Sequence, residues 1–315
     1  MGWIIGIAAL AALGVAVSWV FAGLREKPLT AEARREHAAG DTVSLDAGDL
    51  YYTRRGPTDG PVVVMVHGFG VPQFVFEQNA AALDKAGFHV ILFDHFGRGW
   101  SDRPRASYDA DFYDRELSGL LDALKLKEPV ALVGYSMGGI IAAEFAARHP
   151  GRLSAVCLLA PAGLALQPFL GETFGRLLRV PVIGDWLWRL RGRALLLSDP
   201  QFGEHPADPS RCMQGDDTVQ MRYRGYFPAL LQTWRNLPME NRDAVFGAAS
   251  KGVPMMALFG DADKTIGIES AARLKRAAPH AHIEIIEGGT HGLLYEMHDT
   301  VNPILIDYLR SHSTG

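Results

Sequence analysis

Cysteine and an excess of charge of either sign are both lacking in this sequence. Its 315 residues include two cysteines, Cys157 and Cys212, and no Cys-x-x-Cys motif. A disulfide framework is therefore excluded, and we expect Cys157, which lies in an apolar run, to be a small buried side chain. The 31 Lys and Arg residues against 35 Asp and Glu residues give a net charge of −4, with no block of like charges. This balance excludes a general nucleic-acid binder.

Cysteine and histidine residues at spacings typical of metal ligands are equally scarce. The closest histidine pair, His280 and His282, stands beside Pro279 at the start of a predicted strand, a position typical of the protein surface. We therefore expect neither a metal site nor a cofactor. What the chain has instead is 48% apolar and 21% charged residues, the composition of a folded globular protein. Its length suits one large domain or two small ones.

A long uncharged run stands at the start of the sequence, from Trp3 to Leu24. At 1.5 Å per residue it is long enough to cross a bilayer core of about 30 Å, and it exceeds the apolar region of a signal peptide. Residues 1–24 are therefore predicted to be an uncleaved single-pass membrane anchor, with a cleaved signal peptide and export as the alternative. Basic residues follow the run, which favours a cytoplasmic location for the rest of the protein: Arg25, Lys27, Arg34 and Arg35.

Beyond a polar linker at residues 25–41, short apolar runs alternate with longer amphipathic ones. Runs rich in Val, Ile and Leu predict buried parallel strands at 62–67, 90–94, 130–135, 155–160, 253–260 and 283–287. Segments with apolar residues three and four apart predict helices at 74–86, 111–126, 137–148 and 268–278. Residues 42–54 are typical of an antiparallel hairpin. This alternation predicts an α/β fold, an open sheet covered by helices on both faces.

The alternation stops between residues 162 and 250, where Arg and aromatic residues become frequent. We predict a helical cap at 162–250, inserted into a core formed by 42–161 and 251–315. Residues 173–198 contain five arginines and one aspartate, together with Trp186 and Trp188. Such a segment suits an anionic membrane surface. The alternative is that the tryptophans pack on the core and the arginines are simply solvated.

The strongest local motif is the GxSxG sequence Gly-Tyr-Ser-Met-Gly at residues 134–138. It follows one predicted strand and opens the next predicted helix. The turn there must be sharp, and glycines on both sides of Ser136 remove the Cβ atoms that would clash. Ser136 is therefore the candidate nucleophile, with a structural Gly-Ser turn as the alternative.

A serine nucleophile needs a base, and the base needs a group that orients it. His291 follows the last predicted strand on a glycine-rich loop, and Asp263 follows the strand at 253–260. Because the carboxyl ends of parallel strands meet at one edge of a sheet, we expect both residues to lie near Ser136. Asp263 is the preferred acid, and Asp261 stays open as its alternative.

An oxyanion formed at such a serine requires N–H donors. The sequence His67-Gly-Phe-Gly ends the strand at 62–67, where a backbone amide can face the nucleophile. We assign the two donors to the amides of Phe69 and Met137. His67 is interpreted as structural, because His291 already fills the role of base.

Together with the run Asp-His-Phe-Gly-Arg-Gly-Trp-Ser at 94–101, these motifs closely resemble those of the α/β-hydrolase superfamily over about residues 40–310. The resemblance implies an eight-stranded, mostly parallel sheet, a helical cap after the sixth strand, and a structural role for the run at 94–101. The HGFx sequence, the GxSMGG elbow, the apolar N-terminus and the cap look most like membrane-associated monoacylglycerol lipases and related carboxylesterases. Serine at the elbow argues against haloalkane dehalogenase and epoxide hydrolase relatives, which have aspartate there.

These features predict a serine esterase or lipase that cleaves a small-molecule or lipid ester through an acyl-enzyme, with medium or long acyl chains, such as those of a monoacylglycerol, favoured. The same three residues would also serve C–C bond hydrolysis of ring-cleavage products, acyl transfer or perhydrolysis, and these alternatives stay open. A ligand receptor on the same scaffold is a further alternative. In the cap, Trp186, Trp188 and Phe227 are the predicted substrate contacts.

Overall fold

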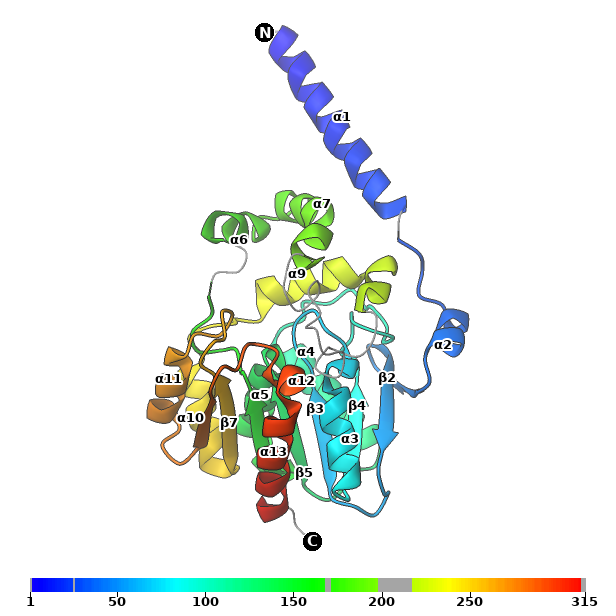
Figure 1. The fold of residues 1–315 in the computed structure, drawn as a ribbon. Helices are drawn as coiled ribbons and strands as arrows, with labels where there is room; N and C mark the ends of the chain where they lie inside the picture. The colour runs from blue at the N-terminus through cyan, green and yellow to red at the C-terminus, as the bar shows by residue number, and fades with distance from the viewer. Residues whose placement is uncertain (1, 25, 168–170, 198–216, 313–315) are drawn as a thin grey trace.

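The fold, seen in a computed structural model, is an eight-stranded sheet between two layers of helices (Figure 1). The structure describes residues 2–24, 26–167, 171–197 and 217–312. The strand order is β1-β2-β4-β3-β5-β6-β7-β8; β1 and β2 pair antiparallel, as do β2 and β4, and the remaining pairs are parallel. The strands are β1 (Asp41–Leu45), β2 (Gly48–Arg55), β3 (Val62–Val66), β4 (His89–Phe93), β5 (Val130–Tyr135), β6 (Leu153–Leu159), β7 (Met255–Gly260) and β8 (His282–Ile286).

The central strands are buried on both faces, which explains why they read as continuous apolar runs in the sequence. Every residue of β4, β5 and β7 is buried. The predicted fold class, a mostly parallel eight-stranded sheet with helices on both faces, is thus confirmed. Cys157 lies within β6 as a buried free thiol, as expected.

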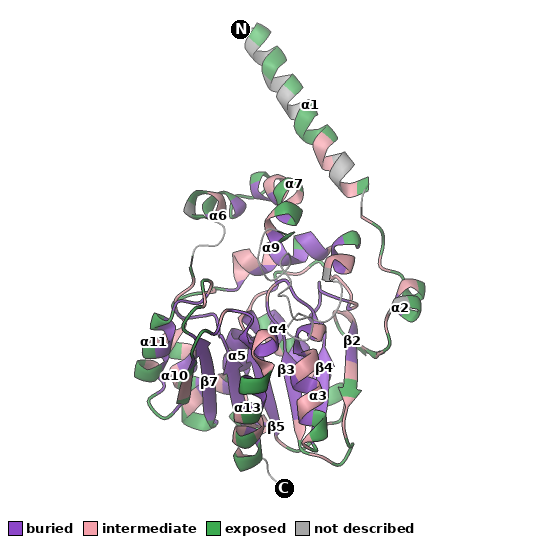
Figure 2. Cartoon of the chain, in the orientation of Figure 1, coloured by how far each residue is buried: buried purple, intermediate pink, exposed green. Residues whose placement is uncertain are grey.

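Helices cover the two faces of the sheet. The elements that pack on the core are α3 (Glu77–Lys85), α4 (Ala110–Ala123), α5 (Met137–Arg148), α10 (Asp243–Gly252), α11 (Glu269–Ala277), α12 (Leu293–Glu296) and α13 (His298–His312), with the short η1 (Gln73–Phe76) and η2 (Pro150–Arg152) between them. On one face, α4 and α10 pack beside α5, and on the other, α12 and α13 pack beside α3. Purple residues along the sheet and the inward sides of these helices mark the buried core in Figure 2.

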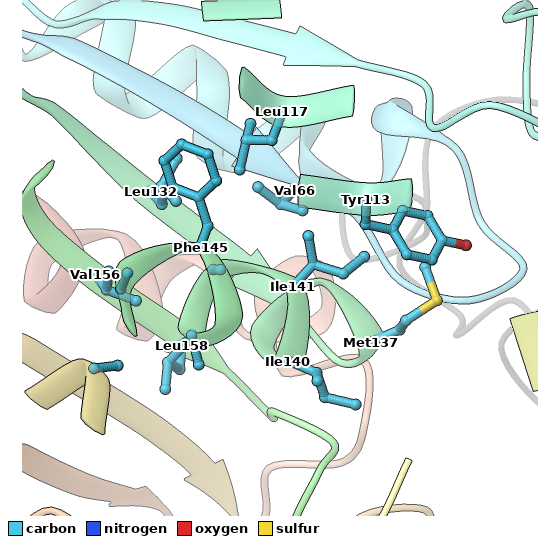
Figure 3. Packing of buried hydrophobic residues seen from close by; sticks show 14 of the residues in the cluster. Val66, Tyr113, Leu117, Leu132, Met137, Ile140, Ile141, Phe145, Val156 and Leu158 are labelled. Atoms are coloured by element: carbon cyan, nitrogen blue, oxygen red, sulfur yellow. The ribbon is translucent and has the colours of Figure 1, made fainter. Parts of the chain in front are cut away.

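The helix that follows the GxSxG motif is the most deeply buried of these elements. Ile140, Ile141 and Phe145 of α5 are at most 3% exposed. They belong to the same apolar cluster as Leu132 and Leu158 of the sheet, and Figure 3 shows Phe145 directed toward Leu132. This packing fixes the axis of α5, and with it the turn at the start of the helix.

A group of helices lies across the carboxyl end of the sheet (Figure 1). Its elements are α6 (Glu172–Leu178), α7 (Ile183–Leu197), η4 (Asp217–Arg222) and α9 (Tyr226–Asn236). These elements have an apolar cluster of their own that includes Leu178, Trp188, Tyr226 and Leu230. We call residues 171–197 and 217–237 the cap.

The segment before the sheet is more structured than a linker. Thr30 accepts a hydrogen bond from the Ala33 amide and begins helix α2 (Ala31–His37). Arg34 of this helix is 9% exposed and donates to the Trp100 carbonyl at 2.6 Å. It also forms an ion pair with Asp102. An N-cap and a buried arginine therefore order part of the predicted linker at 25–41.

The N-terminal helix α1 (Gly2–Leu24) projects from the molecule, and its last turns contact α7 (Figure 1). Ser18 accepts a hydrogen bond from the Trp186 indole at 2.9 Å. Lys27 then pairs with Tyr223 in a short parallel bridge. Within the part of the chain that the structure describes, no helix is long and apolar enough to cross a membrane. The predicted membrane anchor at residues 1–24 is therefore not supported.

Candidate active site

Ser136 occupies the sharp turn between β5 and α5. Its backbone has φ 52° and ψ −117°, a conformation that residues other than glycine rarely adopt. A Cβ at Gly134 would collide with the Gly138 carbonyl, and one at Gly138 would collide with the Val66 carbonyl. The two glycines are therefore required by close backbone approach, as the sequence predicts. The turn leaves Ser136 half-buried at the carboxyl end of the sheet.

The structure brings His291 and Asp263 to Ser136. The distance from His291 Nε2 to Ser136 Oγ is 3.0 Å, and that from His291 Nδ1 to Asp263 Oδ2 is 2.8 Å. The Asp263 side chain is 1% exposed, and its Oδ1 accepts hydrogen bonds from the Thr265 and Ile266 amides. Such a carboxylate is fixed in place and holds the imidazole with Nε2 directed at the serine.

Asp261, the alternative acid, has a different partner. Its Oδ1 accepts a hydrogen bond from the Gly288 amide at 2.7 Å, and the residue is exposed. It therefore links the loop after β7 to the loop after β8, on which His291 lies. The structure places Asp263, not Asp261, against His291.

The two amides predicted to bind an oxyanion are available for it. Met137 is the first residue of α5, so its N–H has no intrahelical partner. Among the described residues, neither this amide nor that of Phe69 donates a hydrogen bond. Both residues line the same pocket as Ser136 and His291. Their arrangement is suitable for binding a negatively charged oxygen at the serine.

A fully buried polar cluster lies beside this site. The His67 ring accepts a hydrogen bond from the His95 amide through Nε2, at 2.9 Å, and its Nδ1 contacts the Gly68 carbonyl. Burial lowers the pKa of His67 and of His95 well below the usual range. Burial has the opposite effect on the carboxyl of Glu116 and raises its pKa to about 8. This carboxyl bonds His95 Nδ1. His67 is therefore a neutral structural residue, as the sequence suggests.

The pocket at Ser136 is a small cavity of about 70 Å³ that opens to solvent. Its walls are mostly apolar. They come from the sheet loops and from the cap: Val71, Ala162, Leu166, Leu196, Trp234 and Met239. His291 is the single ionisable side chain other than tyrosine among the described residues that line it.

The three cap residues predicted to contact substrate do not line this pocket in the described structure. Trp188 donates to the Phe227 carbonyl at 2.8 Å, and both side chains pack inside the cap. Trp186 faces α1 through its bond to Ser18. The walls instead contain Trp234 of α9 and Leu196 of α7. The sequence carries no signal that distinguishes these aromatic residues, because the choice depends on how the cap helices pack on one another.

Arg98, which was not predicted from the sequence to support the site, is fully buried. Its guanidinium donates to the carbonyls of Phe69 and Phe96 and, at 2.7 Å, to Thr233 Oγ1. The sequence offers one signal, since Arg98 stands between Gly97 and Gly99 shortly after an apolar strand. As for metals, no group of three or more possible ligands occurs among the described residues.

Comparison with known proteins gives one family and several relatives. The family model described as the alpha/beta hydrolase fold matches residues 61–296. The human protein named monoacylglycerol lipase ABHD6 is 25% identical over 284 residues, which covers 84% of this chain and 80% of that protein.

Solved structures share the fold. An esterase from Exiguobacterium antarcticum superposes with a TM-score of 0.68 at 23% identity, covering 86% of this chain and 99% of that one. A bromoperoxidase from Bacillus anthracis superposes with a TM-score of 0.67 at 21% identity, covering 86% of this chain and 100% of that one. Since these two neighbours carry different activities, the chemistry has to be argued from the site itself.

Proposed function

Because the chain belongs to the α/β-hydrolase fold family and is an ester hydrolase, we propose that it acts through a triad of Ser136, His291 and Asp263 and a covalent acyl-enzyme on Ser136. The observation that carries this proposal is the pair of contacts at His291. One nitrogen lies 3.0 Å from the serine hydroxyl and the other 2.8 Å from a buried carboxylate. A base oriented in this way can take a proton from a serine without moving.

Acylation begins with attack of Ser136 Oγ on the ester carbonyl. His291 Nε2 takes the hydroxyl proton, and the carboxylate of Asp263 stabilises the imidazolium that forms. The amides of Phe69 and Met137 hold the oxyanion of the tetrahedral intermediate. When the intermediate collapses, the ester C–O bond breaks, and His291 returns the proton to the leaving alcohol.

Deacylation repeats these steps with water. His291 takes a proton from the attacking water, the oxyanion forms at the same two amides, and the acyl–Ser136 bond then breaks. The acid leaves and the proton returns to Ser136. Acyl transfer to an alcohol and perhydrolysis share the acyl-enzyme and differ in the molecule that attacks it, so they remain alternatives for the second half of the reaction.

The pocket supports an ester with an apolar acyl group, of medium or long chain length, as substrate. Leu166, Leu196, Trp234 and Met239 offer apolar surface to an acyl chain. Ring-cleavage products carry carboxylates, and the described lining contains neither Lys nor Arg to pair with them. The pocket therefore favours ester hydrolysis over C–C bond hydrolysis. A monoacylglycerol fits this description.

The outer surface of the cap supports a lipid layer as the source of such a substrate. Large apolar side chains of the cap that are exposed include Leu177, Val180, Val182, Ile183 and Leu190. Basic residues of α6 and α7 are interleaved with them. An apolar surface with cationic residues suits the boundary of an anionic bilayer. Arg189 does not belong to this surface, because it lies over the Trp19 ring and beside Glu26.

The test of the proposed function is hydrolysis of p-nitrophenyl esters, from acetate to palmitate, and of monoacylglycerol by the full-length protein. Ser136→Ala is the control. We expect turnover that peaks at octanoate or longer and is lost in the variant, and a fluorophosphonate should label the wild type alone. Absence of both turnover and labelling would overturn the proposed function. Activity confined to acetate and butyrate would instead contradict the assignment of the acyl group.

A further inference from the structure

The loop that carries the Phe69 amide is held by its carbonyl groups. The Gly68 carbonyl contacts His67 Nδ1 at 2.9 Å, and the Phe69 carbonyl accepts from Arg98 Nε at 3.1 Å. A trans peptide is planar, so the Gly68 carbonyl points away from the Phe69 N–H. Fixing that carbonyl on one side of the peptide therefore also fixes the direction of the Phe69 N–H.

The third carbonyl of the loop is held from the cap. The Gly70 carbonyl accepts two hydrogen bonds, from Gln220 Nε2 at 2.8 Å and from the Tyr226 hydroxyl at 2.9 Å. The two side chains are 3% and 0% exposed. Gln220 also accepts the Gly99 amide at 2.8 Å, so it joins the loop at 68–70 to the loop at 94–101. Both bonds link the cap directly to the oxyanion loop.

Arg98 has a support in the cap as well. Its Nη2 donates to Thr233 Oγ1 at 2.7 Å, and the Tyr113 hydroxyl lies 2.8 Å from the same oxygen. Thr233 is on α9, the helix that begins at Tyr226. Two of the three loop carbonyls thus depend, directly or through Arg98, on η4 and α9 being seated on the sheet.

The glycines of this loop explain why its conformation depends on hydrogen bonds from the cap. Gly68 and Gly70 flank Phe69, and a backbone without Cβ atoms samples more conformations than any other. If the Gly70 carbonyl loses its partners, its peptide is free to rotate, and a buried carbonyl without a partner is also costly. Nothing on the sheet side of Gly70 replaces the two donors among the described residues.

We propose that Gln220 and Tyr226 are positioning residues that hold the oxyanion loop through the Gly70 carbonyl, so that the oxyanion hole is complete only when the cap is seated. This inference rests on the proposed function, because it concerns the same reaction. It assigns the cap a role in transition-state stabilisation in addition to forming the pocket wall. Neither residue contacts the reacting atoms, and both act through Gly70.

The first test compares Tyr226→Phe with Tyr223→Phe in the full-length protein. Each variant loses one hydroxyl from the same stretch of the cap, but Tyr223 contacts Trp100 rather than the loop. We expect Tyr226→Phe to lower kcat by about threefold to tenfold, the effect of one hydrogen bond, with KM little changed. Tyr223→Phe should leave both constants unchanged. A boronic acid, whose tetrahedral adduct needs the oxyanion hole, should bind more weakly to Tyr226→Phe in proportion to the loss of kcat.

The double variant Tyr226→Phe/Gln220→Met removes both donors to Gly70. We expect a loss of kcat larger than the product of the single effects, since either donor alone retains part of the loop geometry. Equal kcat and equal boronate affinity in a double variant that melts like the wild type would overturn the proposal. A proportional rise of KM without loss of kcat would also overturn it, because that pattern belongs to a pocket wall.

Hydrogen–deuterium exchange provides a readout that does not depend on ester turnover. The amides of residues 68–71 should exchange faster in Tyr226→Phe than in the wild type, and no faster in Tyr223→Phe. If the wild type cleaves no ester, the proposed function fails, while exchange still reports whether the cap holds the loop. Unchanged exchange in both the single and the double variant would contradict the inference even in an active esterase.

Discussion

The sheet edge and the cap contribute to the same pocket in different ways. At the sheet edge, Ser136, Asp263 and His291 each lie just beyond a strand, and the hydrogen bonds of the strands fix the ends of the loops. In the cap, Trp234 and Leu196 reach the pocket from helices that pack mainly on one another. The edge therefore supplies the proposed triad, and the cap supplies walls of the pocket and the two donors that bond the Gly70 carbonyl.

This difference explains which parts of the molecule can be predicted from the sequence. A strand end is a local feature, so a motif beside it places a side chain at a known edge. The sequence of a cap helix shows only an amphipathic pattern. Such a pattern indicates that one face of the helix is buried, but it does not identify the element against which that face packs. If chemistry and selectivity are separated along this boundary, substitutions on its two sides will change different kinetic properties.

The largest effect is expected at the sheet edge, for Asp263→Asn. The amide can still accept the Thr265 and Ile266 N–H groups, but its nitrogen cannot accept the proton of His291 Nδ1. The imidazole would then hold the wrong tautomer, and we expect kcat to fall by about 10⁴ at unchanged melting temperature. The measurement is steady-state ester hydrolysis. If Asp261→Asn had the larger effect, the assignment of the acid would be wrong.

The next effect concerns the polar cluster under the edge. Burial raises the pKa of Glu116 to about 8, above its ordinary value of 4.5. The folded protein then binds one more proton than the unfolded chain between these pH values, so stability should fall as the pH rises from about 4.5 to 8. The slope from this group is at most about 1.4 kcal/mol per pH unit. Glu116→Gln should flatten the slope, as measured by urea unfolding across this range. An unchanged slope would show that the carboxyl is not protonated in the fold.

A smaller effect is expected for Trp234→Ala in the cap. Removing the Trp234 ring should change the activation free energy for the preferred ester, calculated from kcat/KM, by about 1–3 kcal/mol. It should also shift the best substrate toward bulkier or longer acyl groups. The chain-length series measures the shift. Trp186→Ala is the matched control, because Trp186 faces α1 instead of the pocket. A shift in Trp186→Ala but not in Trp234→Ala would contradict the description of the pocket and restore the interpretation from the sequence.

The smallest effect is expected on the outer surface of the cap. Arg191→Gln/Arg193→Gln should weaken binding to vesicles that contain anionic lipid by about 1 kcal/mol for each charge removed, without changing hydrolysis of a soluble ester. Sedimentation with the vesicles measures the binding. Arg310→Gln on α13 removes a charge from a helix outside the cap and should have no effect. Equal binding by all variants would leave the cap with no role at a lipid surface.

Much of the fold and the centre of the site could be predicted from the sequence. The six apolar runs correspond to strands β3–β8, and the GxSxG turn, the histidine and the aspartate come together as expected. The prediction missed the C-terminal helix α13 and the helix α2 in the linker. Both are stabilised by contacts with distant residues, such as Asn302 with Asn79 and Arg34 with Trp100, and such contacts leave no periodic pattern.

The supports of the site were missed for the same reason. Gln220 is 150 residues from Gly70, and Thr233 is 135 residues from Arg98. A glutamine, a tyrosine and a threonine in a polar stretch of sequence give no sign that each is buried against one backbone oxygen or one guanidinium. Only the way in which the cap packs on the sheet reveals them.

The backbone of Ser136 has an evolutionary consequence. Its φ of 52° is unfavourable for serine and easy for glycine. Selection for folding alone would therefore favour glycine at this position, and a chain that lost its activity would gain about 1 kcal/mol by that single replacement. The presence of serine in a backbone conformation that suits glycine better therefore indicates selection for the chemistry of its side chain.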